Sequence, residues 1–475
     1  MQDGQTTSGL DLLVLATAVG EGGGGEGGRG RRAGIESGIR EAIVDGRLPA
    51  GARLPSTRAL ARDLGVARST VVDAYAQLVA EGWVAAARGS GTRVASGGAH
   101  VAVRAARAQA LTPPRHDFRP GRPDVSSFPR SAWLAAARRA LRHAPDEALS
   151  YGDPRGDPGL REELAGYLGR ARGVRAHPDL VVVCGGFTQG LSLVGHVLRQ
   201  QGVTALGTEA PGVVHHRAVA AEAGLEVRPV PVDDDGAQVE RLDELGVGAV
   251  LLTPAHQQPI GSSLSAARRG WVLDWARRTG SVVIEDDYDS EYRFDRAPLG
   301  ALQGRAPDVV VYAGTVSKTL APGLRLGWLV LPPDLLDAVV RAKARRDAQQ
   351  GALDQLALAE LIRSGAFDRH VRRMRLRYRA RRDVLVAALA EGAPQVRVTG
   401  LAAGLHAVVE LPAHGPAPSE MAAAAAARGI AVHPLSRFWY GPGACPPALV
   451  VGYGTPPEHA YRRAVAALVA LLGGT

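Results

Sequence analysis

The sequence predicts an α/β protein with a small, mostly helical unit at its N-terminus. From about residue 116 onwards, short β-branched runs alternate with amphipathic helical stretches, which is typical of a mostly parallel sheet covered by helices. Between residues 31 and 96, apolar residues recur at helical spacing and are followed by a hairpin pattern with a glycine tip. The chain has 475 residues, of which 46% are hydrophobic and 22% charged, a composition typical of folded globular proteins.

Composition also excludes several classes of protein. No apolar run reaches the roughly 20 residues that span a bilayer, so we exclude an integral membrane protein. Two cysteines, Cys184 and Cys445, are too few for a disulfide framework. The apolar stretch at residues 10–19 follows Asp3 and no basic residue, which is the wrong charge for a secretion signal. We therefore expect a cytoplasmic protein, and we expect no metal site.

The basic residues are almost all arginine. The net charge is +9, and lysine occurs only at Lys318 and Lys343 among 56 basic residues. A basic balance suits a polyanionic partner, although an arginine-rich composition alone gives the same sign. Because arginine cannot replace a primary amine in covalent chemistry, both lysines are candidates for such chemistry.

The N-terminal unit is expected to follow a glycine-rich stretch at residues 22–30. Apolar spacing, turn residues and a capping serine define its elements. They are a helix from near Arg31 to Asp45, a helix that Ser56 caps and Gly65 ends, a helix from about Arg68 to Glu81, and a hairpin between Val84 and Val94. This order of elements is the pattern of a winged helix-turn-helix.

Three segments carry a resemblance to the GntR family of bacterial repressors: RLPSTRALA at residues 53–61, GVARSTV at 65–71 and AEGW at 80–83. The resemblance implies binding to double-stranded DNA, with the first turn of the third helix in the major groove. It implies that arginines and wing residues contact the DNA, and that hydroxyls and backbone N–H groups hold phosphates. The implied contact residues are Arg58, Arg68, Ser69, Thr70, Arg88 and Gly89.

The charge of this region agrees with that interpretation. Residues 28–96 contain eleven arginines and six acidic residues. The alternative is that these arginines only solvate a small helical domain, which leaves the hairpin and its glycines unexplained. One departure from the family is Val72, which stands where some relatives have a second arginine, so base readout is expected to be narrower or differently placed.

Residues 97–117 are expected to be a linker, because they combine Ser-Gly-Gly with Pro113-Pro114. The second domain is expected at residues 118–475. Its predicted strands lie at the apolar runs 180–184, 205–206, 247–252, 282–284 and 309–312. From about Gln350 the pattern becomes helical and then mixed, which predicts a smaller C-terminal α/β lobe.

The most informative motif of the second domain is YAGTVSKTLAPGLRLGW at residues 312–328, directly after an apolar strand. Lys318 can form a Schiff base with an aldehyde, which arginine cannot do. Thr315, Ser317 and Arg325 are suited to the phosphate group of pyridoxal phosphate (PLP). The alternative for Lys318 is an ordinary surface lysine in a polar loop, which its neighbours make less favourable.

This motif resembles those of fold-type I aminotransferases and, more closely, of the MocR/GabR regulators, in which such an aminotransferase-like domain follows a GntR-type domain. The resemblance covers the chain from about Phe118 to its end. It implies a PLP cofactor that Lys318 carries as an internal aldimine.

A second motif, VIEDDYDSEY at residues 283–292, places carboxylates at the end of an apolar strand. An anion beside a pyridine nitrogen keeps that nitrogen protonated. The resemblance implies this role for Asp286 and a hydrogen bond from Tyr288 to the ring hydroxyl. Spacing alone does not decide whether Asp286 or Asp287 is the partner of the ring nitrogen. Side chains alternate along a strand, so only one of the two can face the ring. The other is expected to cap the strand or pair with Arg293.

Three weaker motifs match the same families. VCGGFTQG at residues 183–190 resembles their phosphate loop, with Phe187 and Thr188 binding through their backbones. SYGDP at residues 150–154 resembles a segment whose tyrosine, here Tyr151, reaches the phosphate of a neighbouring subunit, which implies a homodimer. TPAHQQPIG at residues 253–261 resembles the loop over the ring. An ordinary backbone-bonded histidine remains the alternative for His256.

The substrate machinery of an aminotransferase is less complete. Aminotransferases hold the substrate carboxylate with an arginine near the C-terminus, and Val450 stands at about that position. Arg437 is a candidate replacement nearby, and Val213 follows Pro-Gly where relatives often have tyrosine. We therefore favour a regulator that senses PLP, or an amine that reacts with it, at Lys318. The alternatives are an active aminotransferase with a DNA-binding appendage, and a DNA-binding protein whose large domain only dimerises.

Overall fold

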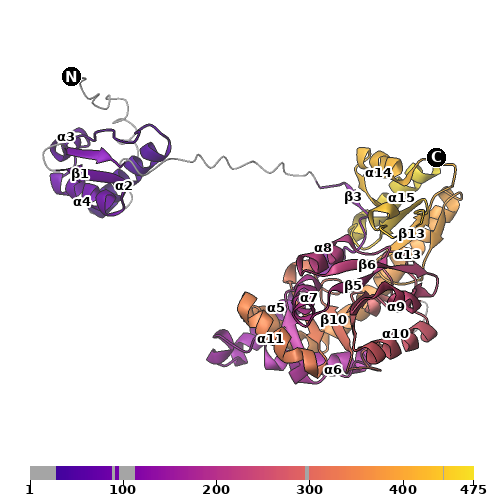
Figure 1. Ribbon diagram of the computed structural model, residues 1–475. Helices are drawn as coiled ribbons and strands as arrows, with labels where there is room; N and C mark the ends of the chain where they lie inside the picture. The colour runs from indigo at the N-terminus through magenta and orange to yellow at the C-terminus, as the bar shows by residue number, and fades with distance from the viewer. Residues whose placement is uncertain (1–27, 88–90, 96–112, 295–298, 442, 475) are drawn as a thin grey trace. The chain divides into compact units, whose positions relative to one another are not determined.

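The computed structural model describes residues 28–87, 91–95, 113–294, 299–441 and 443–474. The chain divides into a first unit, residues 1–111, and a second unit, residues 112–475 (Figure 1). Residues 22–27 of the glycine-rich stretch, the apolar stretch at residues 10–19 and the loop residues Arg88 and Gly89 lie outside the described residues, whereas residues 28–30 begin the first described helix. No helix in the described part of the chain is long and apolar enough to cross a membrane.

The first unit has three helices and a hairpin around one core. They are α2 (Gly28–Val44), α3 (Thr57–Asp63), α4 (Arg68–Ala80), β1 (Val84–Ala87) and β2 (Gly91–Val94). The hydroxyl of Ser56 accepts a hydrogen bond from the backbone N–H of Ala59, 3.2 Å away, so Ser56 caps α3 as expected. β1 and β2 pair antiparallel, with Val84 opposite Val94, as in the wing of a winged helix.

The second unit is built on an eight-stranded sheet in the order β4-β11-β10-β9-β8-β5-β6-β7. Its strands are β4 (Val181–Cys184), β5 (Ala205–Ala210), β6 (Glu226–Asp233), β7 (Gly236–Ala237), β8 (Ala249–Leu252), β9 (Val282–Asp287), β10 (Val310–Thr315) and β11 (Gly327–Val330). The central pairs are parallel, whereas β11 runs antiparallel to both of its neighbours and β7 runs antiparallel to β6. The predicted mostly parallel sheet is confirmed.

Helices cover both faces of this sheet (Figure 1). Side chains alternate along each strand, so Val182 faces one helix layer and Val183 the other. The first layer contains α7 (Phe187–Gln200), α8 (Val214–Glu222) and α11 (Pro333–Asp347). The second contains α5 (Arg130–His143), α6 (Pro158–Arg172), α9 (Leu242–Leu245), α10 (Ala266–Thr279) and α12 (Ala352–Arg363).

A smaller lobe follows at the C-terminal end. Its sheet has the order β12-β13-β16-β15, and the long helix α13 (Ala366–Gly392) packs on it together with α14 (Pro418–Ala427) and α15 (Tyr461–Gly473). The strands are β12 (Arg397–Thr399), β13 (His406–Glu410), β14 (Ile430–Ala431), β15 (His433–Pro434) and β16 (Ala448–Gly452). β14 pairs in parallel with β3 (His116–Asp117), so two residues from the end of the expected linker join this lobe.

Three strands of the large sheet lie outside the apolar runs that predicted strands: β6, the two-residue β7, and β11. β6 has the sequence EVRPVPVD, and its two prolines make it unlike an interior strand. It is nevertheless paired on both sides, with β5 and with the two-residue β7. β11, GWLV, overlaps the last two residues of the Lys318 motif and is too short for its strand character to be evident from the sequence.

Candidate functional site

The candidate site lies where the carboxyl ends of β4, β9 and β10 meet. β9 and β10 are parallel neighbours, with Asp286 in register with Ala313, and β4 has the same direction beyond β11. Asp286 lies near the end of β9, Thr315 ends β10, and Phe187 begins α7 shortly after β4. Ligands of parallel sheets bind at this edge, so the three predicted motifs converge where their chemistry requires.

Lys318 lies in the turn after β10 with its amine directed at another segment. Its Nζ donates a hydrogen bond to the carbonyl of Gly121, 2.7 Å away. Desolvation lowers the pKa of this amine, while the carboxylates of Asp286 and Asp289 oppose the shift. A lowered pKa leaves more of the amine unprotonated, the form that attacks an aldehyde.

The two neighbouring carboxylates of β9 have different surroundings. Asp287 accepts hydrogen bonds from Arg172 and from the hydroxyl of Tyr312, each 2.7 Å away, and these partners hold its pKa low against the effect of burial. Asp286 is buried, and its Oδ1 has no hydrogen-bond partner. Burial raises the pKa of Asp286 well above its ordinary value, although Lys318 lowers it. Asp286 is therefore the carboxylate that can still accept a hydrogen bond from a ligand.

The guanidinium bound to Asp287 belongs to Arg172, a residue that no sequence motif indicates. We expected the carboxylate that turns away from the ring to cap the strand or to pair with Arg293. Arg172 lies at the end of α6, 115 positions earlier in the chain, so no local pattern indicates this pair.

Tyr288 belongs to a buried polar group beside Asp286. Its hydroxyl lies 3.1 Å from Nδ1 of His256, which also lies 2.9 Å from a carboxylate oxygen of Asp289. The ring of His406 packs against that of His256, with centroids 5.2 Å apart. His256 is thus bound to side chains and is more than a loop histidine that bonds backbone. From the sequence, Asp289 is only one of several acidic residues in the 283–292 motif, and its contact with His256 is not predictable.

Arg325, Thr315, Ser317 and the start of α7 form a group suited to an anion. The Thr315 and Ser317 hydroxyl oxygens lie 2.8 Å apart. A Cβ added to Gly186 would lie 3.4 Å from a guanidinium nitrogen of Arg325, so the glycine lets the loop approach this cation. No side chain caps α7, which leaves its first N–H groups available. Arg325 itself has a φ of +51°, a conformation that is uncommon for arginine and is often found at functional sites.

The remaining predicted residues of the second unit have different surroundings. The ring of Phe187 packs against His216 at a centroid distance of 4.7 Å, and the Thr188 hydroxyl lies 3.1 Å from Nε2 of His215. Tyr151 is 95% exposed, and it has no hydrogen bond to any described residue of the site. Its expected role concerns a second subunit.

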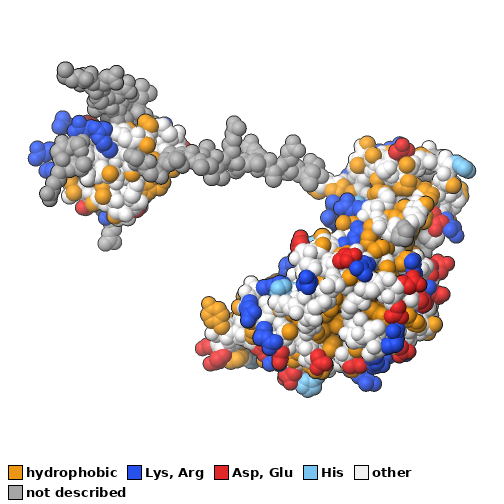
Figure 2. Space-filling view, in the orientation of Figure 1, with side chains coloured by type: hydrophobic (Ala, Val, Ile, Leu, Met, Phe, Trp, Pro, Cys, Tyr) orange, Lys and Arg blue, Asp and Glu red, His pale blue; other side chains and the backbone are white. Residues whose placement is uncertain are grey.

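The predicted DNA contacts of the first unit lie on α3 and at the start of α4. Arg58, Arg68 and Ser69 are exposed, and Thr70 is half-buried. No ion pair within the described residues involves Arg58 or Arg68. Figure 2 shows basic side chains gathered around α3 on this unit. Val72 is 42% exposed on α4, so an apolar side chain is presented beside these residues.

Two contacts that support the Lys318 turn are not indicated by any sequence pattern. The hydroxyl of Tyr292 donates to the carbonyl of Lys318, 3.3 Å away, and Nε2 of His370 donates to the carbonyl of Thr319, 2.8 Å away. His370 lies on α13, 51 positions beyond Thr319. Only the fold brings these residues together.

Comparisons with known proteins agree with the geometry. The model of aminotransferase class I and II matches residues 123–467, and that of bacterial regulatory proteins of the gntR family matches residues 32–94. The HTH-type pyridoxine biosynthesis transcriptional regulator PdxR of Corynebacterium glutamicum is 35% identical over 431 residues, which cover 89% of this chain and 92% of PdxR. The chain belongs to the MocR-type transcriptional regulators. It is also 35% identical over 370 residues to the probable rhizopine catabolism regulatory protein MocR of Rhizobium meliloti, covering 74% and 75% of the two chains.

The second unit of this MocR-type regulator also resembles solved enzymes. The α-aminoadipate aminotransferase LysN of Thermus thermophilus, solved with N-(5'-phosphopyridoxyl)-L-leucine, matches with a TM-score of 0.67 and 28% identity. The match covers 75% of this chain and 92% of LysN. The regulator therefore joins a gntR-type DNA-binding domain to an aminotransferase-like fold, as the sequence predicted.

Proposed function

We propose that this MocR-type regulator holds PLP at Lys318 and senses PLP itself, or an amine that reacts with it. The residues fit the cofactor in two respects. Asp286 has a buried oxygen without a partner, which a protonated ring nitrogen would satisfy. Arg325, Thr315, Ser317 and the N–H groups of Phe187 and Thr188 would hold the phosphate. When bound, PLP supplies an aldehyde carbon for exchange between amines and an electron-accepting ring.

Other residues of the site would bind and orient the ring. Tyr288 would donate a hydrogen bond to the ring hydroxyl, and His256 holds the tyrosine oxygen from the other side, 3.1 Å away. Asp289 in turn holds His256, 2.9 Å away. This chain of contacts would fix the position of the proton at the Tyr288 oxygen.

The hydrogen bond between Lys318 and Gly121 is the observation that supports a sensor at this site. The Lys318 amine donates to the carbonyl of Gly121, 2.7 Å away, and Gly121 lies five residues after the start of β3, where the second unit begins. Covalent use of this amine changes the hydrogen bond to Gly121. A ligand bound at Lys318 would therefore change the contacts of the segment around Gly121, which follows the linker. The free energy for a switch would come from different effector affinities of the two arrangements.

We further propose a cytoplasmic homodimer on a DNA operator, with Tyr151 reaching the phosphate of the partner subunit. Tyr151 is 95% exposed, although a tyrosine ring has a large apolar area that is usually covered. Leu149, two residues earlier, is 58% exposed, so the segment presents two large apolar side chains to solvent.

An active aminotransferase is the alternative function, favoured by the likeness to LysN. Two residues weigh against it. Val450 lies on β16 with its side chain completely buried among Val408, Leu435 and Phe438, so this position supplies no cation. Arg437, the replacement considered from the sequence, is exposed on the turn after β15.

The test measures binding to the DNA upstream of the regulator's own gene, with and without PLP, for wild type and Lys318→Ala. We expect PLP to change the affinity of wild type about fivefold or more, a typical allosteric coupling, and to leave the variant unchanged. Equal effects of PLP on both proteins would contradict a sensor at Lys318. Multiple turnovers of an amino acid by wild type would instead favour the aminotransferase.

A further inference from the structure

The long helix α13 carries an unusual density of positive charge. Eight arginines lie between residues 369 and 382, and this stretch contains no acidic residue. Asp368 and Asp383 are the acidic residues that flank it. The proposed site at Lys318 uses none of these arginines.

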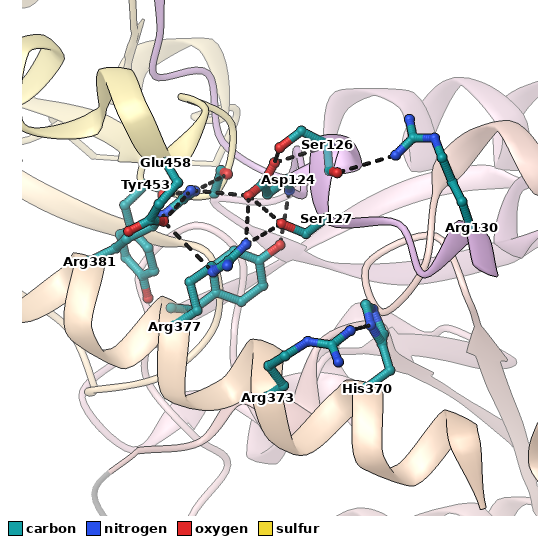
Figure 3. A network of polar contacts seen from close by, with 12 residues as sticks. Asp124, Ser126, Ser127, Arg130, His370, Arg373, Arg377, Arg381, Tyr453 and Glu458 are labelled. Carbon is teal, nitrogen blue, oxygen red and sulfur yellow. Dashed lines mark hydrogen bonds and ion pairs between the residues drawn. The ribbon is translucent and has the colours of Figure 1, made fainter. Parts of the chain in front are cut away.

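Two of these arginines face the interior and are neutralised there. Arg381, only 2% exposed, binds Asp124 and Glu458 at 3.0 Å each. Arg377 lies 3.5 Å from Asp124 and 3.7 Å from Glu458, and it also donates to the Ser127 hydroxyl. Figure 3 shows both guanidinium groups directed at Asp124. These contacts fasten α13 to the start of the second unit and to its C-terminal lobe.

Other arginines of α13 face outwards. Arg369, Arg372, Arg373 and Arg379 are exposed, and none of them has an ion pair within the described ranges. Leu376 lies among them and is 69% exposed. A shallow groove of about 280 Å³ runs along this face, lined by Phe294, Arg372, Arg375, Leu376 and Arg379. We call the outward arginines, with Leu376, the α13 basic face.

We propose that the α13 basic face binds the phosphate backbone of double-stranded DNA, as a second contact in addition to that of the first unit. Arg372 and Arg379 are seven residues apart, so they lie on one side of the helix at a separation of about 10 Å. A DNA duplex carries about six phosphates over that length. Arginine forks match phosphate oxygens, and Leu376 is suited to the apolar side of a sugar.

The tether between the two units favours DNA as the occupant. The first unit carries the gntR-type domain, and both units belong to one chain. DNA held by the first unit is therefore present at a high effective concentration for the second, which makes even a weak additional contact significant. Contacts to phosphates alone carry no base preference, so this surface would add affinity without changing the sequence that is read.

α13 also contacts the turn that holds Lys318. Arg373, on the basic face, donates to Nδ1 of His370, 2.9 Å away (Figure 3). The other ring nitrogen of His370 donates to the carbonyl of Thr319, 2.8 Å away. Thr319 follows Lys318 directly. The proposed DNA contact thus lies two hydrogen bonds from the backbone of the cofactor lysine. The DNA contact itself does not depend on which small molecule binds at Lys318.

The experiment measures the affinity of the full chain for a duplex of arbitrary sequence, about 40 base pairs or roughly four helical turns long. Affinity is followed between about 50 and 200 mM salt for wild type and for Arg372→Ala/Arg379→Ala. Each lost phosphate contact makes the negative slope of log affinity against log salt shallower by about 0.9. We expect the slope of the double variant to be less steep than that of wild type by about 1.8. We also expect the double variant to have a lower affinity at low salt.

Two further variants make the outcome specific. Arg277→Ala/Arg278→Ala removes the same net charge from α10, where these arginines already pair with Asp308 and Asp243, and it should keep the wild-type slope. Arg58→Ala/Arg68→Ala tests the first unit separately. If only the Arg58/Arg68 variant loses affinity, the α13 proposal is overturned and its face serves another partner. If the two double variants on α13 and α10 lose affinity equally, net charge accounts for the effect and the proposal is likewise overturned.

Discussion

Arg172 and Asp287 form an ion pair in the interior of the second unit, with Nε of the arginine 2.7 Å from a carboxylate oxygen and both side chains 2% exposed. Asp286, the preceding residue, has an oxygen with no partner. Two adjacent carboxylates of one strand therefore serve different purposes. One binds and neutralises a buried cation, and the other remains available for a ligand.

This difference predicts opposite effects of two matched substitutions. Asp287→Asn removes the carboxylate that Arg172 binds in the interior and should destabilise the second unit by about 3 to 5 kcal/mol. Asp286→Asn removes no partner, so it should change stability by less than about 1 kcal/mol while weakening PLP binding strongly. Urea unfolding and PLP titration by absorbance measure the two quantities. A greater loss of stability in Asp286→Asn than in Asp287→Asn would contradict the assignment.

Lys343, the second of the two lysines, is expected to position the phosphate loop. It is fully buried, its Nζ lies 2.9 Å from both carboxylate oxygens of Asp347, and Asp347 accepts from Gln189, 2.6 Å away. Gln189 in turn accepts from the N–H of Gly185, 2.5 Å away. Lys343→Met should cost about 3 kcal/mol of stability, because it leaves a carboxylate unpaired, and should weaken PLP binding.

A double variant separates the two effects of Lys343. Lys343→Met/Asp347→Leu replaces the ion pair with apolar side chains and should recover most of the stability. PLP affinity should stay low, because Gln189 has lost the acceptor that orients it. Recovery of both properties would mean that the pair acts on stability alone and does not position the loop.

His370 predicts a pH dependence of stability. Burial lowers the pKa of His370 to about 4, below the value of about 6.5 for an unperturbed histidine. Between these values the unfolded chain binds more protons than the folded one, so stability falls as pH drops from 6.5 towards 4. Relative to His370→Gln, wild type should lose up to about 3 kcal/mol between pH 7 and 4. The exposed His143→Gln is the control, and a parallel pH profile for both variants would refute the prediction.

Gly186 is expected to be required for PLP binding, because it lies close to the guanidinium of Arg325. Its φ is +91°, and an added Cβ would lie 3.4 to 3.6 Å from the guanidinium of Arg325. Gly202 has a similar φ of +95° with no atom within 4 Å of the added Cβ. Both alanine variants should lose about 1 to 2 kcal/mol of stability from the backbone conformation. Only Gly186→Ala should also weaken PLP binding, measured by titration.

Much of this site was predictable because its chemistry lies in short segments. Lys318, Thr315, Ser317 and Arg325 follow one strand closely, and the residue types alone indicate a Schiff base and a phosphate. Alternation along β9 showed that one aspartate must turn away from the site. The β-branched runs likewise located β4, β8, β9 and β10 to within a few residues.

The contacts that were missed join distant parts of the chain. Gly121 and Lys318 are 197 positions apart, and Arg172 and Asp287 are 115 apart. No periodicity or motif records which helix end will meet which strand end, because packing decides it. β6 was missed for a different reason, since two prolines reduce its local strand preference while its neighbours on both sides supply the hydrogen bonds.

The two-residue strand β3 has a mechanical consequence. His116 donates its backbone N–H to Gly429, 3.0 Å away, and Phe118 donates to Ala431, 2.8 Å away, so the chain enters the second unit on its smaller lobe. Phe118 is then fully buried in the core of that lobe. Any displacement of the smaller lobe against the large sheet would carry this entry point with it. A rotation of this lobe would therefore shift residue 116, at which the chain coming from the first unit enters the second.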